Sequence, residues 1–119
     1  MSTIFMPKVG TQKLFDVMVS DKTYSNLKDS CGVYSVFHRY GSRANCLYVG
    51  LSVSLKTRAA RFFKNEFIDA FYLRCVINQI PKHSIIIGVK YAQDKSELRV
   101  LESIYIEQLN PMLNIATNR

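Results

Sequence analysis

The chain has 119 residues, of which 48% are hydrophobic and 21% charged, and this balance excludes a disordered or low-complexity protein. The length is enough for one domain with a buried core and too short for two. With 16 Lys and Arg residues against 9 Asp and Glu residues, the formal net charge of +7 favours a polyanionic partner, although a basic but inert surface would give the same composition.

The three cysteines, Cys31, Cys46 and Cys75, show no paired C-x-x-C spacing, so neither a disulfide framework nor a zinc site is predicted. The N-terminal residues lack the pattern of a secretion signal, and no apolar run approaches the about 18 residues that a membrane helix needs. We therefore expect an intracellular, reducing compartment and no membrane.

Residues 1–30 are predicted to form an N-terminal extension, followed by one domain over residues 31–119. The apolar residues between Thr11 and Ser20 fit a strand or a short helix equally well, and residues 20–26 are polar and loop-like. We expect this extension to pack on the core or to reach toward a substrate.

Residues 32–37 alternate in polarity like a half-buried strand, and residues 40–45 consist of turn-forming types. The short apolar run 46–50 reads as a second strand that closes at Gly50. Together they predict an antiparallel hairpin, in which Gly32 and Gly50 allow close backbone approach at the strand ends.

An amphipathic helix is expected next, with Ser52 or Ser54 as its N-cap. Its apolar residues recur at helical spacing, and its cations lie outside that stripe. The apolar stripe is Leu55, Ala59, Phe62 and Phe63, and the cations are Lys56, Arg58, Arg61 and Lys64.

The remaining elements are a buried helix within Phe67 to Ile80, stopped by Pro81, and a β-branched central strand from Ser84 to Tyr91. A last helix, capped by Asp94 or Ser96, runs to about Leu109, before Asn110-Pro111. This order predicts an α+β fold with a small three-stranded sheet, antiparallel or mixed, flanked by helices.

One carboxylate of the last helix is placed unusually. At about 100° per residue, Glu102 falls inside the apolar arc, whereas Glu97 and Glu107 lie off it. The arc consists of Leu98, Leu101, Tyr105 and Leu109. An inward carboxylate is costly unless a cation or hydrogen-bond donors meet it, so Glu102 is either a metal ligand or the partner of a buried salt bridge to Arg58 or Arg61.

Taken together, these segments resemble the GIY-YIG nucleases. Gly32-Val33-Tyr34 stands where the family has its GIY, and Tyr48-Val49-Gly50 where it has YIG. Arg58 falls eight residues after Gly50, where the family's helix carries its catalytic arginine. Glu102 and the sequence Asn110-Pro111-Met112-Leu113-Asn114 match the family's metal-binding glutamate and C-terminal Pro-x-x-Asn, and the resemblance covers residues 31 to 115.

The resemblance implies a metal-dependent endonuclease that hydrolyses DNA phosphodiester bonds. Glu102 would hold one Mg²⁺, or Mn²⁺, because a single carboxylate with waters and phosphate oxygens satisfies a hard cation. Arg58 would grip the scissile phosphate and stabilise charge in the transition state. Tyr34 and Tyr48 would orient or activate the attacking water, Tyr34 being the first choice.

Two further sets of residues complete the expected site. Asn114 would orient the active-site loop through amide hydrogen bonds, as the resemblance implies. Lys56, Arg61 and Lys64 are candidates for contacts with the nucleic-acid backbone.

One position departs from the family, in which many members carry histidine and some tyrosine four residues after the arginine. Phe62 stands there, so the chain would depend on Tyr34 or Tyr48, or be slow or inactive, since His38 and His83 lie elsewhere in the sequence. The alternative is therefore a non-catalytic nucleic-acid-binding module on the same fold. A small-molecule enzyme is disfavoured because no cofactor fingerprint is present.

Members of the family attach this module to separate DNA-recognition domains, for which the chain has almost no room. A structure-selective activity, a homodimer and a separate recognition partner are the open alternatives for its specificity.

Overall fold

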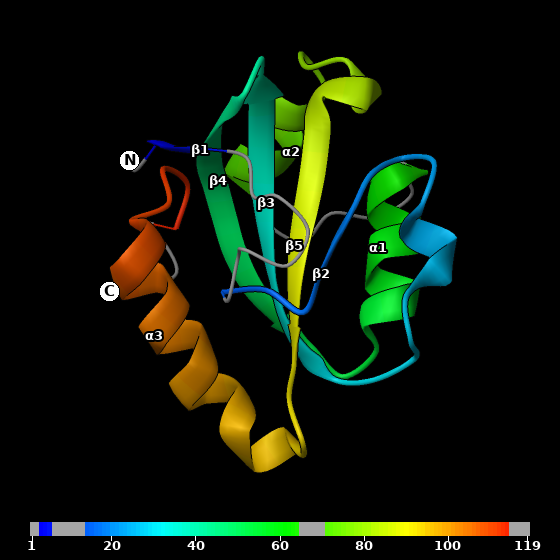
Figure 1. Cartoon of the computed structure of the whole chain (residues 1–119), viewed down its shortest axis with the longest axis vertical. Coiled ribbons are helices and arrows are strands. Elements are labelled where there is room, and N and C mark those ends of the chain that lie inside the picture. The colour runs from blue at the N-terminus through cyan, green and yellow to red at the C-terminus, as the bar shows by residue number, and fades with distance from the viewer. Residues whose placement is uncertain (1–2, 6–13, 65–70, 115–119) are drawn as a thin grey trace.

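The computed structural model describes residues 3–5, 14–64 and 71–114. These residues form a five-stranded sheet of order β1-β4-β3-β5-β2 in which every neighbouring pair is antiparallel (Figure 1). The strands are β1 (Thr3–Phe5), β2 (Val17–Val19), β3 (Gly32–Tyr40), β4 (Arg43–Ser52) and β5 (Ile85–Tyr91). The helices are α1 (Leu55–Phe63), α2 (Phe71–Ile77) and α3 (Leu98–Leu109), with 3₁₀ turns η1 (Tyr24–Asn26), η2 (Lys82–Ser84) and η3 (Lys95–Glu97).

The predicted α+β class is confirmed, but the predicted number of three strands was wrong. The central strands β4, β3 and β5 are extended on both sides by three-residue strands of the N-terminal segment. β1 pairs with residues 43–45 of β4, and β2 pairs with residues 87–89 of β5. Alternation over three residues is too short to identify a strand, which is why the run from Thr11 to Ser20 left strand and helix open. Residues 11–13 of that run lie outside the described part.

The β3–β4 hairpin is present as predicted and is longer than the sequence indicated. Its turn consists of Gly41 and Ser42 alone, and Gly41 has a φ of +64°, a conformation that glycine adopts without strain. A bulge interrupts the register, because Val36 pairs with Tyr48 whereas the next residue of β3 pairs with Cys46. The extra residue, Leu47, therefore lies on the same face of the sheet as Tyr48.

The helices begin and end at the residues that local chemistry favours. Ser54 caps α1 by accepting a hydrogen bond from the Thr57 backbone N–H at 3.4 Å, and the predicted apolar stripe is the buried side of this helix. α2 lies inside the predicted helix 67–80, of which residues 67–70 are outside the described part. Asp94 caps η3, which leads into α3, and Asn110 ends α3 in the left-handed region with a φ of +47°.

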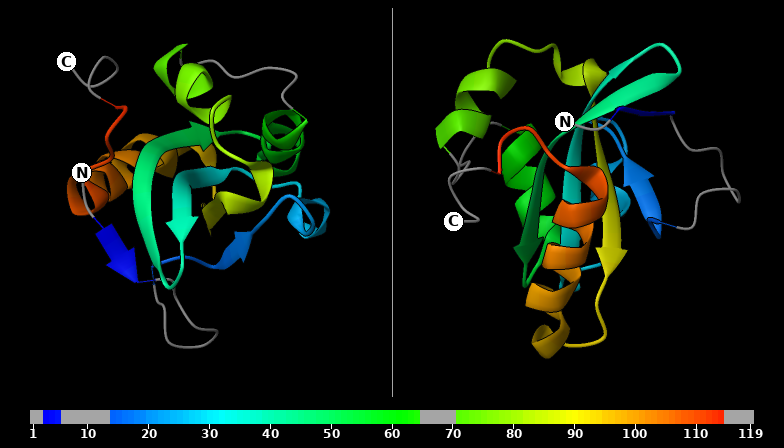
Figure 2. Two further views of the ribbon diagram at one scale, coloured as in Figure 1. Left: turned by 90° about the horizontal axis from the view of Figure 1, so that it is seen from above. Right: turned by 90° about the vertical axis from the view of Figure 1, so that its left-hand side faces the viewer.

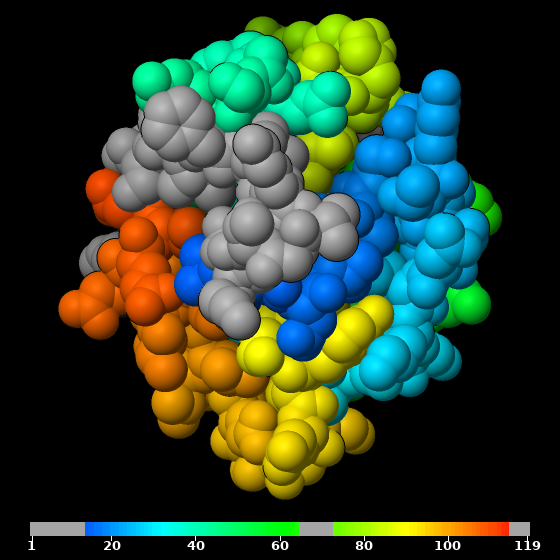
Figure 3. Space-filling view, viewed as in Figure 1, coloured from blue at the N-terminus to red at the C-terminus, as the bar shows by residue number. Residues whose placement is uncertain are grey.

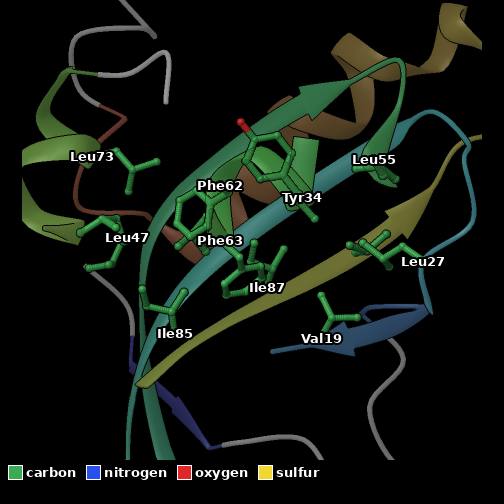
Figure 4. Packing of buried hydrophobic residues seen from close by; sticks show 14 residues of the cluster. Val19, Leu27, Tyr34, Leu47, Leu55, Phe62, Phe63, Leu73, Ile85 and Ile87 are labelled. Carbon is green, nitrogen blue, oxygen red and sulfur yellow. The ribbon is translucent and has the colours of Figure 1, made fainter. Parts of the chain in front are cut away.

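Each face of the sheet carries an apolar core, and Figure 2 shows α1 and α2 together on one side of the sheet. On one face α1 and α2 contribute Leu55, Phe62 and Leu73 to a cluster that includes Tyr34 of β3 (Figure 4). On the other face α3 packs mainly against β4 and β3, where Tyr105 and Leu109 join residues of both strands. No helix within residues 14–64 and 71–114 is long and apolar enough to cross a bilayer.

Candidate active site

Two tyrosines meet on the α1 face of the hairpin. The ring centroids of Tyr34 and Tyr48 are 6.2 Å apart, with their planes inclined by 37°. Gly50 lies opposite Tyr34 in the strand register, and a Cβ atom built on it would lie 2.6 Å from the Tyr34 hydroxyl oxygen and 2.9 Å from Cε2 of Tyr48. The absence of a side chain at Gly50 therefore lets the two phenol rings come together over the strand.

Arg58 comes from α1, which follows directly after this hairpin. Its half-buried side chain and the Tyr34 ring line the same narrow cavity of about 10 Å³, with Ala59 and Phe62 of α1 in its wall. Phe62 is only 5% exposed and belongs to the core, where its ring meets that of Phe63 edge to face at 5.5 Å. The position four residues after Arg58, where many family members carry histidine and some tyrosine, is therefore occupied by an apolar core residue next to Tyr34 and Arg58.

Neither histidine lines the cavity shared by Tyr34 and Arg58. His38 is four residues beyond Tyr34 on β3, about 13 Å along the strand, where its ring packs edge-on against Tyr40. His83 is exposed in η2.

Asn114 holds the backbone of β4 between the residues of the YIG-like motif. Its Oδ1 accepts a hydrogen bond from the Val49 N–H at 2.8 Å, and its Nδ2 donates to the Val49 carbonyl oxygen at 2.8 Å. The side chain is 2% exposed. Upstream, the N–H groups of Met112 and Leu113 donate to the carbonyl oxygens of Cys46 and Leu47. The segment after α3 therefore runs along the outer edge of β4 and fixes the strand next to Tyr48.

Glu102 lies on α3 in the inward arc that periodicity predicted, with Leu98, Tyr105 and Leu109 buried beside it. The carboxylate is half-buried, and burial raises its pKa, although the Arg99 charge acts in the opposite direction. Within the described residues no hydrogen bond or ion pair to this carboxylate is present, so the alternative of a buried salt bridge is not realised there. Glu102 does not line the cavity of Tyr34 and Arg58.

The described residues contain no cluster of side chains that could bind a metal ion. No three or more His, Cys, Asp or Glu residues come together among them. A metal held here would therefore depend on one carboxylate, with water and substrate oxygens as the remaining ligands.

The predicted nucleic-acid contacts Lys56, Arg61 and Lys64 are all exposed on the side of α1 away from the core. Sequence reasoning missed the bulge at Leu47, which places Leu47 and Tyr48 on the same face of the sheet. The signal that could have revealed it is the pair of large residues Leu47-Tyr48, which breaks the alternation of β4.

The fold matches a known architecture. The chain is similar to the GIY-YIG N-terminal endonuclease domain of UvrC from Thermotoga maritima bound to magnesium, with a TM-score of 0.57, 18% sequence identity, and coverage of 79% of this chain and 93% of that domain. The fold is therefore that of a GIY-YIG nuclease domain, as the motifs predicted.

The sequence relatives bear the same name as the protein to which that domain belongs. The chain is 31% identical over 96 residues to UvrABC system protein C of Wolinella succinogenes and 25% identical over 89 residues to that of Pseudoalteromonas atlantica. These matches cover 79% and 75% of this chain but span only 15% and 14% of the length of those proteins. No family model matches the sequence.

Variants of the Thermotoga domain were also solved with the cation. Three carry a tyrosine-to-phenylalanine substitution and one an asparagine-to-alanine substitution, and each is bound to the catalytic divalent cation.

Proposed function

We propose that this chain is a metal-dependent endonuclease that hydrolyses phosphodiester bonds in DNA. The observation that carries the proposal is the packing of Tyr34 against Tyr48 over Gly50, beside a cavity that Arg58 also lines. Two tyrosines and one arginine from different elements thereby lie at one end of the hairpin. This combination suits a phosphate with a water molecule beside it.

Glu102 would reach a common site around the outer edge of β4. α3 packs on the face of the sheet opposite to Tyr34 and Tyr48, but it runs beside β4, the strand that carries Tyr48 (Figure 1). The segment after α3 lies along that edge, where the Met112 N–H donates to the Cys46 carbonyl oxygen and Asn114 binds the backbone of Val49.

The chemistry of Glu102 fits a hard divalent cation such as Mg²⁺ or Mn²⁺. Burial raises the pKa of the Glu102 carboxyl group, so a nearby positive charge would stabilise its ionised form. Carboxylate oxygens are also the type of ligand that these ions prefer. When bound, the cation would neutralise charge on the phosphate and on the leaving oxygen. The magnesium-bound UvrC domain supports this cofactor.

The chain's own groups would divide the remaining work. Arg58 would bind the scissile phosphate through its planar fork and stabilise the charge that develops there. The hydroxyl groups of Tyr34 and Tyr48 would orient the attacking water. Asn114 would keep the strand in place through Val49.

Outside the site, Lys56, Arg61 and Lys64 would follow the phosphate backbone. A DNA substrate would make the working compartment intracellular, and a second copy of the chain or a recognition partner would supply specificity.

Nicking of supercoiled plasmid in the presence of Mg²⁺ tests the proposal. Glu102→Gln removes the charge with little change in shape and should lower the nicking rate at least about 100-fold. The matched control is Glu107→Gln, which changes an exposed carboxylate of the same helix and should leave the rate within about twofold of the wild type. Undiminished nicking by the Glu102 variant, in a preparation free of other nucleases, would refute the site.

A second candidate function is favoured by one observation, the burial of Phe62 beside Tyr34 and Arg58. A phenylalanine there transfers no proton, so the same fold would serve as a non-catalytic DNA-binding module. Such a module would bind duplex DNA with a steep salt dependence and show no Mg²⁺-dependent nicking. The plasmid assay therefore separates the two functions.

A further inference from the structure

The net positive charge of the chain comes from its middle segment. Residues 31–93 contain nine Lys and Arg residues and two acidic residues, Glu66 and Asp69, so that nine minus two gives +7, the entire formal charge. The other residues contain seven of each sign and balance. The middle segment forms β3, β4, α1, α2, η2 and β5, whereas four acidic residues lie between Asp94 and Glu107, on η3, α3 and their caps.

Part of this charge lies at the end of the sheet farthest from Gly32. There the β3–β4 turn adjoins η2, and we refer to Arg39, Tyr40, Lys82 and His83 as the hairpin-end surface. All four residues are exposed, and Tyr40 is 46% exposed. Figure 3 shows the atoms of the turn and those of the chain near residue 80 side by side at the top of the molecule.

The described elements that meet at the hairpin-end surface, β3, β4, η2 and β5, contain no acidic residue. Two cations beside an exposed aromatic ring, on elements that carry no carboxylate, favour a polyanion over a protein partner of mixed charge.

The hairpin-end surface is also preformed. The two-residue turn at Gly41 reverses the chain sharply, and the Tyr40 hydroxyl accepts a hydrogen bond from the Asn45 side chain. The His38 ring packs edge-on against Tyr40 with centroids 5.1 Å apart. Because these contacts hold the ring and the turn, binding there would cost little conformational entropy.

We propose that the hairpin-end surface is a second contact for duplex DNA, separate from the active site; this inference rests on the proposed function. From Tyr34 to Tyr40 the strand extends about 20 Å, which corresponds to about six base pairs at about 3.4 Å each. A two-stranded β-ribbon also has the dimensions that the major groove admits. The substrate is therefore a duplex that continues at least about six base pairs to one side of the cleaved bond.

Binding of a fluorescent duplex of about 30 base pairs, measured by anisotropy in EDTA, tests this contact without any cleavage. Replacing Arg39→Ala together with Lys82→Ala should weaken binding about tenfold at about 0.1 M salt and lower the slope of log K against log salt by nearly 2. The control, Lys95→Ala with Arg99→Ala, removes two cations near the acidic residues of α3, at the opposite end of the sheet, and should change binding less than about twofold. Arg39→Lys with Lys82→Arg keeps the charge and should restore the slope.

The outcomes separate this inference from the proposed function. An unchanged affinity of the Arg39 and Lys82 variant, or an equal loss in the control variant, would overturn the second contact. If the wild-type protein nicks plasmid and the Arg39 and Lys82 variant binds duplex normally, the proposed function is supported and the second contact is refuted. Wild-type protein that fails to bind duplex at low salt would refute both. Thermal unfolding of each variant verifies that the fold is retained.

Discussion

Gly50→Ala should damage the candidate site far more than the fold. The added Cβ would lie 2.6 Å from both Cζ and the hydroxyl oxygen of Tyr34, whereas carbon atoms in contact are normally about 3.5 to 4.0 Å apart. The end of the Tyr34 ring must therefore retreat by about 1 Å, and Tyr48 is pressed as well. Such overpacking costs about 1–3 kcal/mol of stability. A displacement of about 1 Å in a positioning group lowers the rate about 100-fold.

Gly88→Ala is the matched control, because its Cβ would lie 2.8 Å from the Phe15 ring in the core on the other face of the sheet. We expect both variants to lose similar stability in urea denaturation, and only Gly50→Ala to lose plasmid nicking at saturating DNA. If Gly50→Ala folds and nicks like the wild type, the reasoning that the Tyr34 and Tyr48 hydroxyls serve the reaction is refuted. If both variants lose nicking equally, the loss in Gly50→Ala is due to lower stability and not to displaced tyrosines.

Three further predictions follow from single side chains. Asn114→Ala should cost about 2–4 kcal/mol in urea denaturation, because it leaves the N–H and C=O of Val49 without their buried partner; a loss below about 1 kcal/mol would contradict this. Phe62→Tyr should cost about 1–3 kcal/mol and raise plasmid nicking about tenfold or more, since it brings a hydroxyl beside Tyr34; a slower or equal rate would contradict a proton-transfer deficit. Because burial raises the Glu102 pKa, the folded state favours the protonated carboxyl group, and the free energy of unfolding falls as pH rises and Glu102 ionises. Glu102→Gln should therefore raise the melting temperature in EDTA at neutral but not at acid pH, and Mg²⁺ should raise it only in the wild type.

Much of the fold could be predicted because periodicity reports which side of an element is buried. The apolar stripe of α1 and the arc of α3 follow the 3.6-residue period, and their residues are the ones that pack on the sheet. β1 and β2 were not identified, because their pairing depends on partners more than 35 residues away along the chain. Phe15 illustrates the difficulty, since its place beneath Gly88 and beside Tyr105 follows from tertiary packing alone.

The candidate site was only partly accessible from the sequence. The inward placement of Glu102 follows from helical geometry, and its partial burial agrees with that expectation. The paired hydrogen bonds of Asn114 with Val49, 65 residues apart, and the contact of Tyr34 with Tyr48 over Gly50 required the strand register, including the bulge at Leu47. The catalytic roles of these residues remain predictions.

The central claim is that one divalent ion would be shared by Glu102 and the groups of the hairpin and α1. Titration of ¹⁵N- and ¹³C-labelled protein with Mn²⁺, observed by paramagnetic broadening in NMR spectra, tests it most directly. We predict that substoichiometric Mn²⁺ broadens the signals of Glu102, Tyr34, Tyr48 and Arg58 together, and that Glu102→Gln abolishes this broadening. Broadening confined to α3, with the hairpin and α1 signals unchanged, would contradict the account.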